Sequence, residues 1–306
     1  MVTLDDVRAA AVRIRGVAVR TPLLDVGGLA LKCENLQPMG AFKVRGACNM
    51  IAQLSPAARA AGVITYSSGN HGQAVALVAQ RFGIPAVVVM PETAPPIKVA
   101  GVRRYGAEVI LAGTTTLHRK ARAEAELAAR GLTMVPPFDD PWVIAGQGTV
   151  GLEILEQCPA VTTVFVPAGG GGLISGVSAA IKGMRGGVRI VGVEPDGAAK
   201  MSRSRAAGHP VTLDHVSSIA DGLLAVRPGE LTFEHVQALV DDVVTVSDDQ
   251  IRAAVKWLFS EANLVAEPSG AAAVAGALAR GAGAGQSVAI VSGGNVDPAA
   301  YAEYII

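Results

Sequence analysis

The segment Val161-Thr162-Thr163-Val164-Phe165-Val166-Pro167-Ala168-Gly169-Gly170-Gly171-Gly172 joins an apolar run to four consecutive glycines. Val161 to Val166 is rich in β-branched residues, which is typical of a strand that is buried on both faces. The residues that follow, Leu173 to Met184, have the composition of a helix. A strand, a glycine turn and a helix in this order predict a unit of an α/β fold.

Further apolar runs share this character and alternate with Ala-rich helical segments. The runs are Val63 to Tyr66, Ala86 to Met90, Val109 to Ala112, Ile190 to Val193 and Val288 to Val291. The clearest helical segments are Gln73 to Phe82, Leu117 to Arg130 and Asp248 to Asn263, the last preceded by Ser247 as an N-cap. The alternation predicts an α/β protein with parallel strands between layers of helices.

Length and composition exclude several classes of protein. A chain of 306 residues suggests two domains, and 26 Lys+Arg balance 26 Asp+Glu, which favours neither nucleic acid nor an anionic membrane as partner. Cys33, Cys48 and Cys158 are far apart, so neither disulfides nor a zinc site is indicated. Residues 1–16 have the pattern of an amphipathic helix rather than a signal peptide. We therefore expect a protein of the cytoplasm that does not enter membranes.

The glycine run is a candidate phosphate site. Successive backbone N–H groups at a helix N-terminus suit a phosphate dianion, because the helix dipole adds a positive end. The P-loop pattern of ATP-binding proteins is absent, so the phosphate is expected to belong to a cofactor or a small metabolite. A hinge loop is the alternative interpretation.

A second glycine pattern, Gly146-Gln147-Gly148-Thr149-Val150-Gly151, has the spacing of a dinucleotide-binding turn. That function also needs an acidic residue at the end of the next strand, and Val161 to Val166 ends in Pro167 instead. We therefore expect no nicotinamide dehydrogenase. The glycines are expected to allow close packing of a helix against a strand.

Lys43 lies in Gly40-Ala41-Phe42-Lys43-Val44-Arg45-Gly46, among small and apolar residues. Partial burial would lower the pKa of its amine, which could then attack an aldehyde. Lys32 and Lys98 lack such neighbours. Ser67-Ser68-Gly69-Asn70-His71-Gly72 adds a polar turn rich in backbone donors. These stretches and the glycine run together indicate a pyridoxal-phosphate enzyme.

The chain resembles the serine/threonine dehydratase and serine racemase family of fold-type II pyridoxal-phosphate enzymes. The similarity extends from Arg20-Thr21-Pro22-Leu23 to Ser292-Gly293-Gly294-Asn295. It includes Lys32-Cys33-Glu34-Asn35-Leu36-Gln37, Pro137-Phe138-Asp139-Asp140-Pro141, Ala145-Gly146-Gln147-Gly148-Thr149, Ala220-Asp221-Gly222 and Glu267-Pro268-Ser269-Gly270-Ala271.

The resemblance implies a tryptophan synthase β-like fold with two open, twisted, mostly parallel sheets and helices on both faces. It implies a discontinuous large cofactor-binding domain, residues 1–50 and 140–306, and a small domain, residues 51–139, that carries the Ser67 to Gly72 loop. A homodimer is also implied.

The resemblance further implies roles for individual residues. Lys43 would bind the cofactor covalently beside Phe42, Asn70 would bond the ring hydroxyl, and Ser292 would face the ring nitrogen. A neutral hydroxyl there makes a weaker electron sink than a carboxylate would, which favours elimination over transamination. The implied cofactor-binding set is Phe42, Lys43, Asn70, Gly169, Gly170, Gly171, Gly172, Leu173, Gly222, Glu267, Ser292 and Gly293. The implied substrate-binding set is Ser67, Ser68, Gly69, Asn70 and His71.

The implied reaction is β-elimination from a small β-hydroxy amino acid, with Lys43 as general base. L-Threonine would give 2-oxobutanoate and L-serine pyruvate, each with ammonia. Ser68 leaves serine racemisation open, because racemases use a serine there as a second acid/base. A 3-hydroxyaspartate or phenylserine dehydratase is a further alternative. A non-catalytic binding protein is disfavoured, since the key residues named above are intact.

Two positions depart from the family. Ala41 replaces a serine, which removes one hydroxyl near the cofactor without touching the roles above. In the racemases a divalent cation binds where this chain has Glu194-Pro195-Asp196-Gly197-Ala198-Ala199-Lys200. Glu194 and the Ala198 carbonyl remain, but Lys200 replaces the second acidic ligand. We therefore expect no metal site and no dependence on Mg²⁺ or Ca²⁺.

Overall fold

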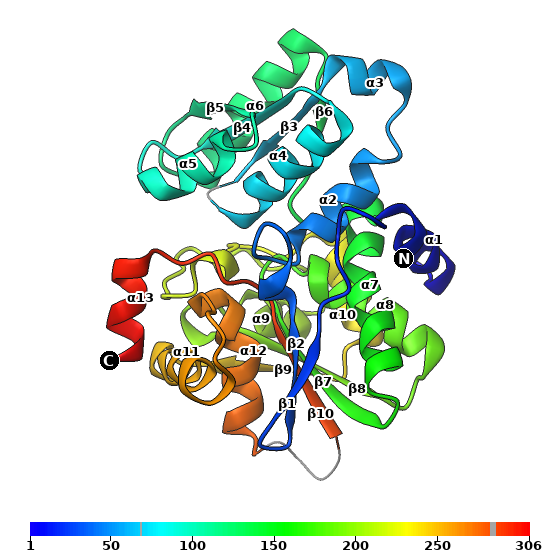
Figure 1. The fold of residues 1–306 in the computed structure, drawn as a ribbon, viewed down its shortest axis with the longest axis vertical. Helices are drawn as coiled ribbons and strands as arrows, with labels where there is room; N and C mark the ends of the chain where they lie inside the picture. Colours follow the sequence, from blue (N-terminus) through cyan, green and yellow to red (C-terminus); the bar gives the residue numbers. More distant parts are fainter. Residues whose placement is uncertain (68, 282–285) are drawn as a thin grey trace.

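The computed structural model describes residues 1–67, 69–281 and 286–306, which form two sheets with helices around them (Figure 1). The larger sheet has the order β1-β2-β10-β7-β8-β9. Only the β1–β2 pair is antiparallel among the described strands of this sheet. Its strands are β1 (Leu23–Val26), β2 (Leu29–Cys33), β7 (Val161–Pro167), β8 (Arg189–Pro195), β9 (Asp242–Val246) and β10 (Gln286–Val291).

The smaller sheet has the order β5-β4-β3-β6 and is parallel throughout the described residues. Its strands are β3 (Val63–Tyr66), β4 (Ala86–Met90), β5 (Glu108–Leu111) and β6 (Thr133–Met134). Every apolar run that the sequence predicted as a strand forms one. The predicted fold class, two mostly parallel sheets among helices, is confirmed.

The helices also follow the predicted pattern. They are α1 (Leu4–Arg13), α2 (Lys43–Ile51), α3 (Pro56–Ala61), α4 (Asn70–Phe82), α5 (Pro96–Arg103), α6 (Thr116–Arg130), α7 (Pro141–Gln157), α8 (Gly172–Met184), α9 (Lys200–Ala207), α10 (Glu230–Leu239), α11 (Asp248–Ala262), α12 (Pro268–Ala279) and α13 (Pro298–Ile305). Short 3₁₀ turns are η1 (Glu34–Leu36), η2 (Asp196–Ala198) and η3 (Asp221–Leu223). Ser247 caps α11 as expected, accepting a hydrogen bond from the Gln250 N–H. In the described ranges, no helix has the length and apolarity needed to cross a bilayer.

The larger sheet is a middle layer whose alternate side chains enter two cores. Leu31, Phe165 and Val191 pack with residues of α11 and α12 on one face. Val164 and Ile190 pack on the other face with residues of α7, α8 and α10. Figure 1 shows these two groups of helices on opposite sides of the sheet. Burial of both faces explains why the strands are continuously apolar.

The Gly146 to Gly151 pattern lies inside α7 rather than at a turn after a strand. A Cβ on Gly146 would lie 2.6 Å from the Arg45 carbonyl oxygen of α2. A Cβ on Gly148 would lie 2.7 Å from the Gly176 carbonyl oxygen of α8. The expected packing of a helix against a strand is therefore wrong, because these glycines let α7 approach two other helices.

The strands of the smaller sheet all come from residues 63–134, and those of the larger sheet come from outside that range. Helix α2 lies between the two sheets in Figure 1 and contacts both α4 and α7. Residues 51–139 as a separate small domain stay a prediction. The position of α2 nevertheless places its first residue, Lys43, between the part of the chain that forms the smaller sheet and the part that forms the larger sheet.

Candidate active site

Lys43 is held at the carboxyl end of the larger sheet by the backbone just before it. The Phe42 N–H donates a hydrogen bond of 3.1 Å to the carbonyl of Ser292, which directly follows β10. Ala41 forms an isolated antiparallel bridge with Gly293. These contacts bring Lys43 and Ser292 together although they are far apart in the sequence. Both belong to the predicted site.

The Lys43 amine has few polar neighbours. Its Nζ donates a hydrogen bond of 2.7 Å to the Pro137 carbonyl and lies 5.1 Å from the centre of the Phe42 ring. Burial lowers the pKa of Lys43 to about 8. A substantial fraction of the amine is therefore neutral at slightly alkaline pH and able to act as nucleophile or base.

His71 contributes a neutral ring. Burial, together with the positive charge of Lys43, lowers the pKa of His71 to about 3. Its Nε2 lies 2.9 Å from the Val135 carbonyl oxygen. An uncharged imidazole can donate or accept a hydrogen bond near the amine without adding a charge.

The glycine run connects β7 to α8, as predicted. No described backbone carbonyl accepts a hydrogen bond from the N–H groups of Gly169, Gly170 or Gly171. Gly171 has a φ of 101°, which favours glycine. A Cβ on Gly170 would lie 2.3 Å from the Phe138 ring, so the ring leaves no space for a side chain. Free donors at the start of a helix suit a phosphate dianion.

Asn70, the first residue of α4, contacts Glu267, the residue before α12. The Asn70 side-chain amide donates a hydrogen bond of 2.5 Å to Glu267 Oε1, and its oxygen accepts one of 2.8 Å from the Asn295 amide. Burial, reinforced by Asp221, raises the pKa of Glu267 to about 8. The Glu267 carboxyl is therefore mostly protonated and uncharged at neutral pH.

Gly222 lies beside the glycine run and is connected to Ser292 through Ser269. The Ser292 hydroxyl is 3.4 Å from the Ser269 carbonyl oxygen, and the Ser269 hydroxyl accepts a hydrogen bond of 2.8 Å from the Gly222 N–H. A Cβ on Gly169 would lie 3.2 Å from the Gly222 carbonyl oxygen. Leu173 follows in the first turn of α8 with its side chain in the sheet core. The predicted cofactor residues are thus neighbours in the fold.

The predicted substrate loop lies where β3 ends and α4 begins. The Ser67 hydroxyl accepts a hydrogen bond of 3.2 Å from the Gly69 N–H, and Gly69 precedes the helix as its N-cap. A helix of 13 residues offers unpaired N–H groups and a positive dipole end to a carboxylate. A Cβ on Gly69 would meet nothing within 4 Å, so there is open space beside the loop. Ser68 lies outside the described residues.

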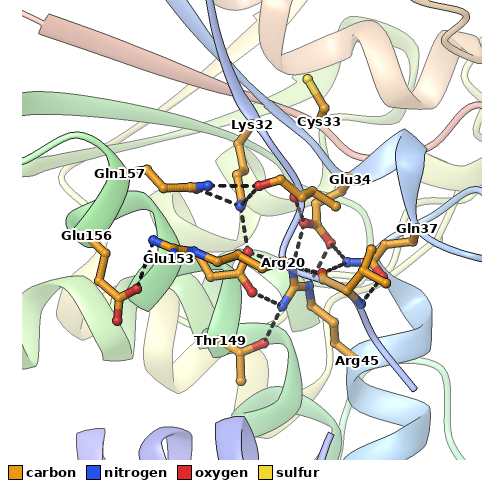
Figure 2. A network of polar contacts seen from close by, with 12 residues as sticks. Arg20, Lys32, Cys33, Glu34, Gln37, Arg45, Thr149, Glu153, Glu156 and Gln157 are labelled. Atoms are coloured by element: carbon orange, nitrogen blue, oxygen red, sulfur yellow. Dashed lines mark hydrogen bonds and ion pairs between the residues drawn. The ribbon is translucent and has the colours of Figure 1, made fainter. Parts of the chain in front are cut away.

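A buried ionic network anchors the helix that begins with Lys43 (Figure 2). Arg45 donates two hydrogen bonds to Glu34, at 2.7 and 2.8 Å, and two to Glu153, at 2.7 and 2.9 Å. Lys32 pairs with Glu153 at 2.5 Å. Two cations facing two carboxylates tie α2 to β2, η1 and α7 without net charge.

Several residues that line the site have no role predicted from the sequence. Pro137 accepts from Lys43, Phe138 covers the glycine run, Asn295 holds Asn70, and Ser269 holds Gly222. Each belongs to a stretch that carried the family resemblance. The family resemblance of these stretches was therefore a signal that they lie near the site. No local sequence pattern, however, reveals which carbonyl or ring lies beside Lys43.

The position that differs from the racemases is occupied by a lysine side chain. The Lys200 Nζ lies 3.6 Å from Glu194 Oε2 in the interior of the protein. Among the described residues, no group of three or more His, Cys, Asp or Glu side chains is arranged to hold a metal ion.

Comparison with known proteins identifies relatives over nearly the whole chain. A family model described as pyridoxal-phosphate dependent enzyme matches residues 14–293. The L-threonine ammonia-lyase of Thermotoga maritima is 45% identical, over 97% of this chain and 76% of that protein. The serine racemase of Schizosaccharomyces pombe is 40% identical, over 99% of this chain and 97% of that protein. The solved structure of maize serine racemase has a TM-score of 0.95 and 40% identity, covering 99% of this chain and 96% of that one.

Proposed function

The chain belongs to the family of pyridoxal-phosphate dependent enzymes, and from that premise we propose that it eliminates water from L-threonine or L-serine. The products are 2-oxobutanoate or pyruvate, with ammonia. The observation that carries this proposal is the partly buried Lys43 amine beside the Phe42 ring, on a backbone segment that is hydrogen-bonded to Ser292 through the Phe42 N–H. The 45% identity to a threonine ammonia-lyase over almost the full chain supports the same activity.

The described residues fit the cofactor. Lys43 would bind its aldehyde carbon, the free N–H groups of Gly169 to Gly171 would bind its phosphate, and Ser292 would face its ring nitrogen. When bound, the cofactor supplies the electron withdrawal that makes the α-proton of an amino acid acidic. Ser292 and the protonated Glu267 carboxyl add no negative charge that would hold the ring nitrogen protonated. Such a site favours loss of a leaving group over transamination.

The protein's own groups supply binding and proton transfer. The N-terminus of α4, with Asn70 and His71, would bind the substrate carboxylate. Lys43 Nζ would then remove the α-proton as general base, which its lowered pKa permits at slightly alkaline pH. Loss of the β-hydroxyl and hydrolysis complete the reaction, so that the water released is taken up again and ammonia leaves.

The test is release of 2-oxo acids by the purified holoenzyme. We expect 2-oxobutanoate from L-threonine or pyruvate from L-serine, and loss of both in Lys43→Ala. Lys256→Ala changes an exposed lysine that binds the chain end and serves as control. The screen includes 3-hydroxyaspartate and phenylserine. A holoenzyme that releases no 2-oxo acid from L-threonine or L-serine would contradict the proposal.

Serine racemisation is a second candidate, favoured by the racemase relatives and by Ser68. If Ser68 is a second acid/base, Ser68→Ala would abolish D-serine formation and keep most of the elimination. Chiral chromatography of the products separates the two activities. Equal loss of both activities in Ser68→Ala would contradict this role.

Independence from divalent cations is part of the same proposal. The Lys200 ammonium beside Glu194 supports it, because a positive charge already neutralises this carboxylate. Activity should survive EDTA and should not rise with added Mg²⁺ or Ca²⁺. Loss of activity with EDTA and recovery with Mg²⁺ would contradict it. The homodimer and the cytoplasmic location stay predictions, and light scattering of the holoenzyme tests the first.

A further inference from the structure

Lys200 is a buried lysine that takes no part in the proposed reaction. It is the first residue of α9, and its side chain has 0% exposure. Burying an ammonium group costs free energy unless hydrogen bonds and a counter-charge compensate it. Its Nζ donates hydrogen bonds of 2.9 Å to the Ala168 carbonyl and 2.9 Å to the Leu223 carbonyl. It therefore joins three segments that are separate in the sequence.

Glu194 holds the ammonium in place from the side of β8. Its two carboxylate oxygens accept hydrogen bonds from the Met201 N–H at 2.9 Å and the Ser202 N–H at 2.8 Å. The same carboxylate lies 3.6 Å from Lys200 Nζ. Because Glu194 is bound to the first turn of α9, it fixes both the helix and the lysine that starts it.

The Ala168 carbonyl belongs to the peptide group that carries the Gly169 N–H. A trans peptide is planar, so its carbonyl and its N–H point in opposite directions, and no described peptide bond is cis. The Ala168 N–H donates to the Val193 carbonyl at 2.7 Å, which fixes the preceding peptide. When Lys200 binds the Ala168 carbonyl, the Gly169 N–H must point away from Lys200.

Through the Leu223 carbonyl, the same ammonium group also binds a turn that packs against Gly169. Leu223 ends η3, whose Gly222 carbonyl oxygen would lie 3.2 Å from a Cβ on Gly169. One ammonium therefore holds the peptide that opens the glycine run and the turn that packs against it. The positive charge of Lys200 also attracts a dianion that is bound by the N–H groups of the glycine run.

We propose that Lys200 is a positioning residue for the cofactor phosphate, whose ammonium group orients the first N–H donor of the glycine run. This inference rests on the proposal that the run binds the phosphate. If the Gly169 N–H is no longer oriented, its hydrogen bond to the charged phosphate is lost. The loss of one hydrogen bond to a charged group weakens the binding of the ligand about 10- to 100-fold. The effect should be confined to ligands that carry a phosphate.

The experiment compares pyridoxal phosphate with pyridoxal, which has the aldehyde but no phosphate. Apoprotein of the wild type and of Lys200→Met is titrated with each ligand by absorbance, and melting temperatures check the fold. We expect pyridoxal phosphate to bind about 10- to 100-fold more weakly to the variant, with pyridoxal changed less than about twofold. Ammonium chloride, but not tetramethylammonium chloride, should restore part of the phosphate preference in Lys200→Ala.

Lys182→Met is the matched control. Lys182 also donates to two backbone carbonyls, those of Gly186 and Val188, and pairs with Asp241, but it lies near the end of α8 far along the helix from the run. We expect its preference for the phosphate to equal that of the wild type. If Lys200→Met does not fold, Lys200→Leu, which likewise removes both the N–H donors and the charge, is measured by the same criterion.

Two results would overturn the inference: an unchanged phosphate preference in folded Lys200 variants, or equal weakening of both ligands, which indicates a general structural role. A wild-type protein that binds neither ligand would instead contradict the proposed function itself.

Discussion

Asn70, the first residue of α4, donates a hydrogen bond of 2.5 Å to Glu267, the residue before α12. The contact joins a helix of the smaller sheet to a helix of the larger one. It also places a carboxyl group with a pKa of about 8 beside Asn70 in the candidate site. Because that group is protonated at neutral pH, the contact is a neutral hydrogen bond rather than an ionic one.

Glu267→Gln should change how the stability of the apoprotein depends on pH. The pKa of Glu267 rises from 4.5 in the unfolded chain to about 8 in the folded one. The folded state therefore binds more protons at this group between these values, and the contribution of Glu267 to wild-type stability falls as pH rises through this window by at most about 1.4 kcal/mol per unit. In urea unfolding at pH 5.5, 6.5 and 7.5, the free energy of unfolding of Glu267→Gln should increase relative to that of the wild type as the pH rises. Parallel pH curves would rule out the raised pKa.

Arg45→Met should destabilise the protein strongly. The change leaves the Glu34 carboxylate buried without its cation, which costs about 3–5 kcal/mol of unfolding free energy. Arg122→Met is the control, because Arg122 pairs with Glu126 one turn away on the surface and contributes less than about 1 kcal/mol. Urea unfolding of both variants measures the difference. Similar losses in both would show that the network in Figure 2 does not anchor α2.

Gly171→Ala should weaken binding of pyridoxal phosphate. Gly171 has a φ of 101°, and a Cβ there would lie 2.7 Å from Thr232. The left-handed conformation alone costs an alanine about 1–2 kcal/mol. Gly187→Ala is matched to it, because a Cβ at Gly187 meets nothing within 4 Å and its φ is not positive. Titration of both apoproteins should show a loss of affinity of about tenfold or more in Gly171→Ala alone.

Covalent uptake of pyridoxal phosphate by the apoprotein should depend on the pKa of Lys43. Only the neutral amine attacks an aldehyde, and burial lowers its pKa from 10.5 to about 8. The rate constant should therefore rise as pH rises through 8 and level off above pH ~9. Rapid-mixing absorbance measures this rate constant. The reference is Nα-acetyllysine, whose free side-chain amine should react faster with rising pH up to pH ~10.4. A protein rate that follows the reference curve would contradict the lowered pKa.

Local patterns sufficed to predict the strands and the helix that follows the glycine run. The apolar run Val288 to Val291 forms a buried strand, and the glycine run leads into a helix. Both could be predicted because the pattern that indicates each of them lies within one short segment of the chain. The Gly146 to Gly151 pattern failed, since its meaning depends on helices α2 and α8 that pack against it. The contacts of Pro137 with Lys43 and of Lys200 with Ala168 were equally hidden, because these partners lie 94 and 32 residues apart in the sequence.

The most direct measurement maps the residue that binds the cofactor. The wild type and Lys43→Ala are incubated with pyridoxal phosphate, reduced with borohydride, digested and analysed by mass spectrometry. We expect the added mass on the peptide that contains Lys43 and no specific label in Lys43→Ala. Labelling of another lysine such as Lys32 or Lys98, or no label in the wild type, would contradict this expectation.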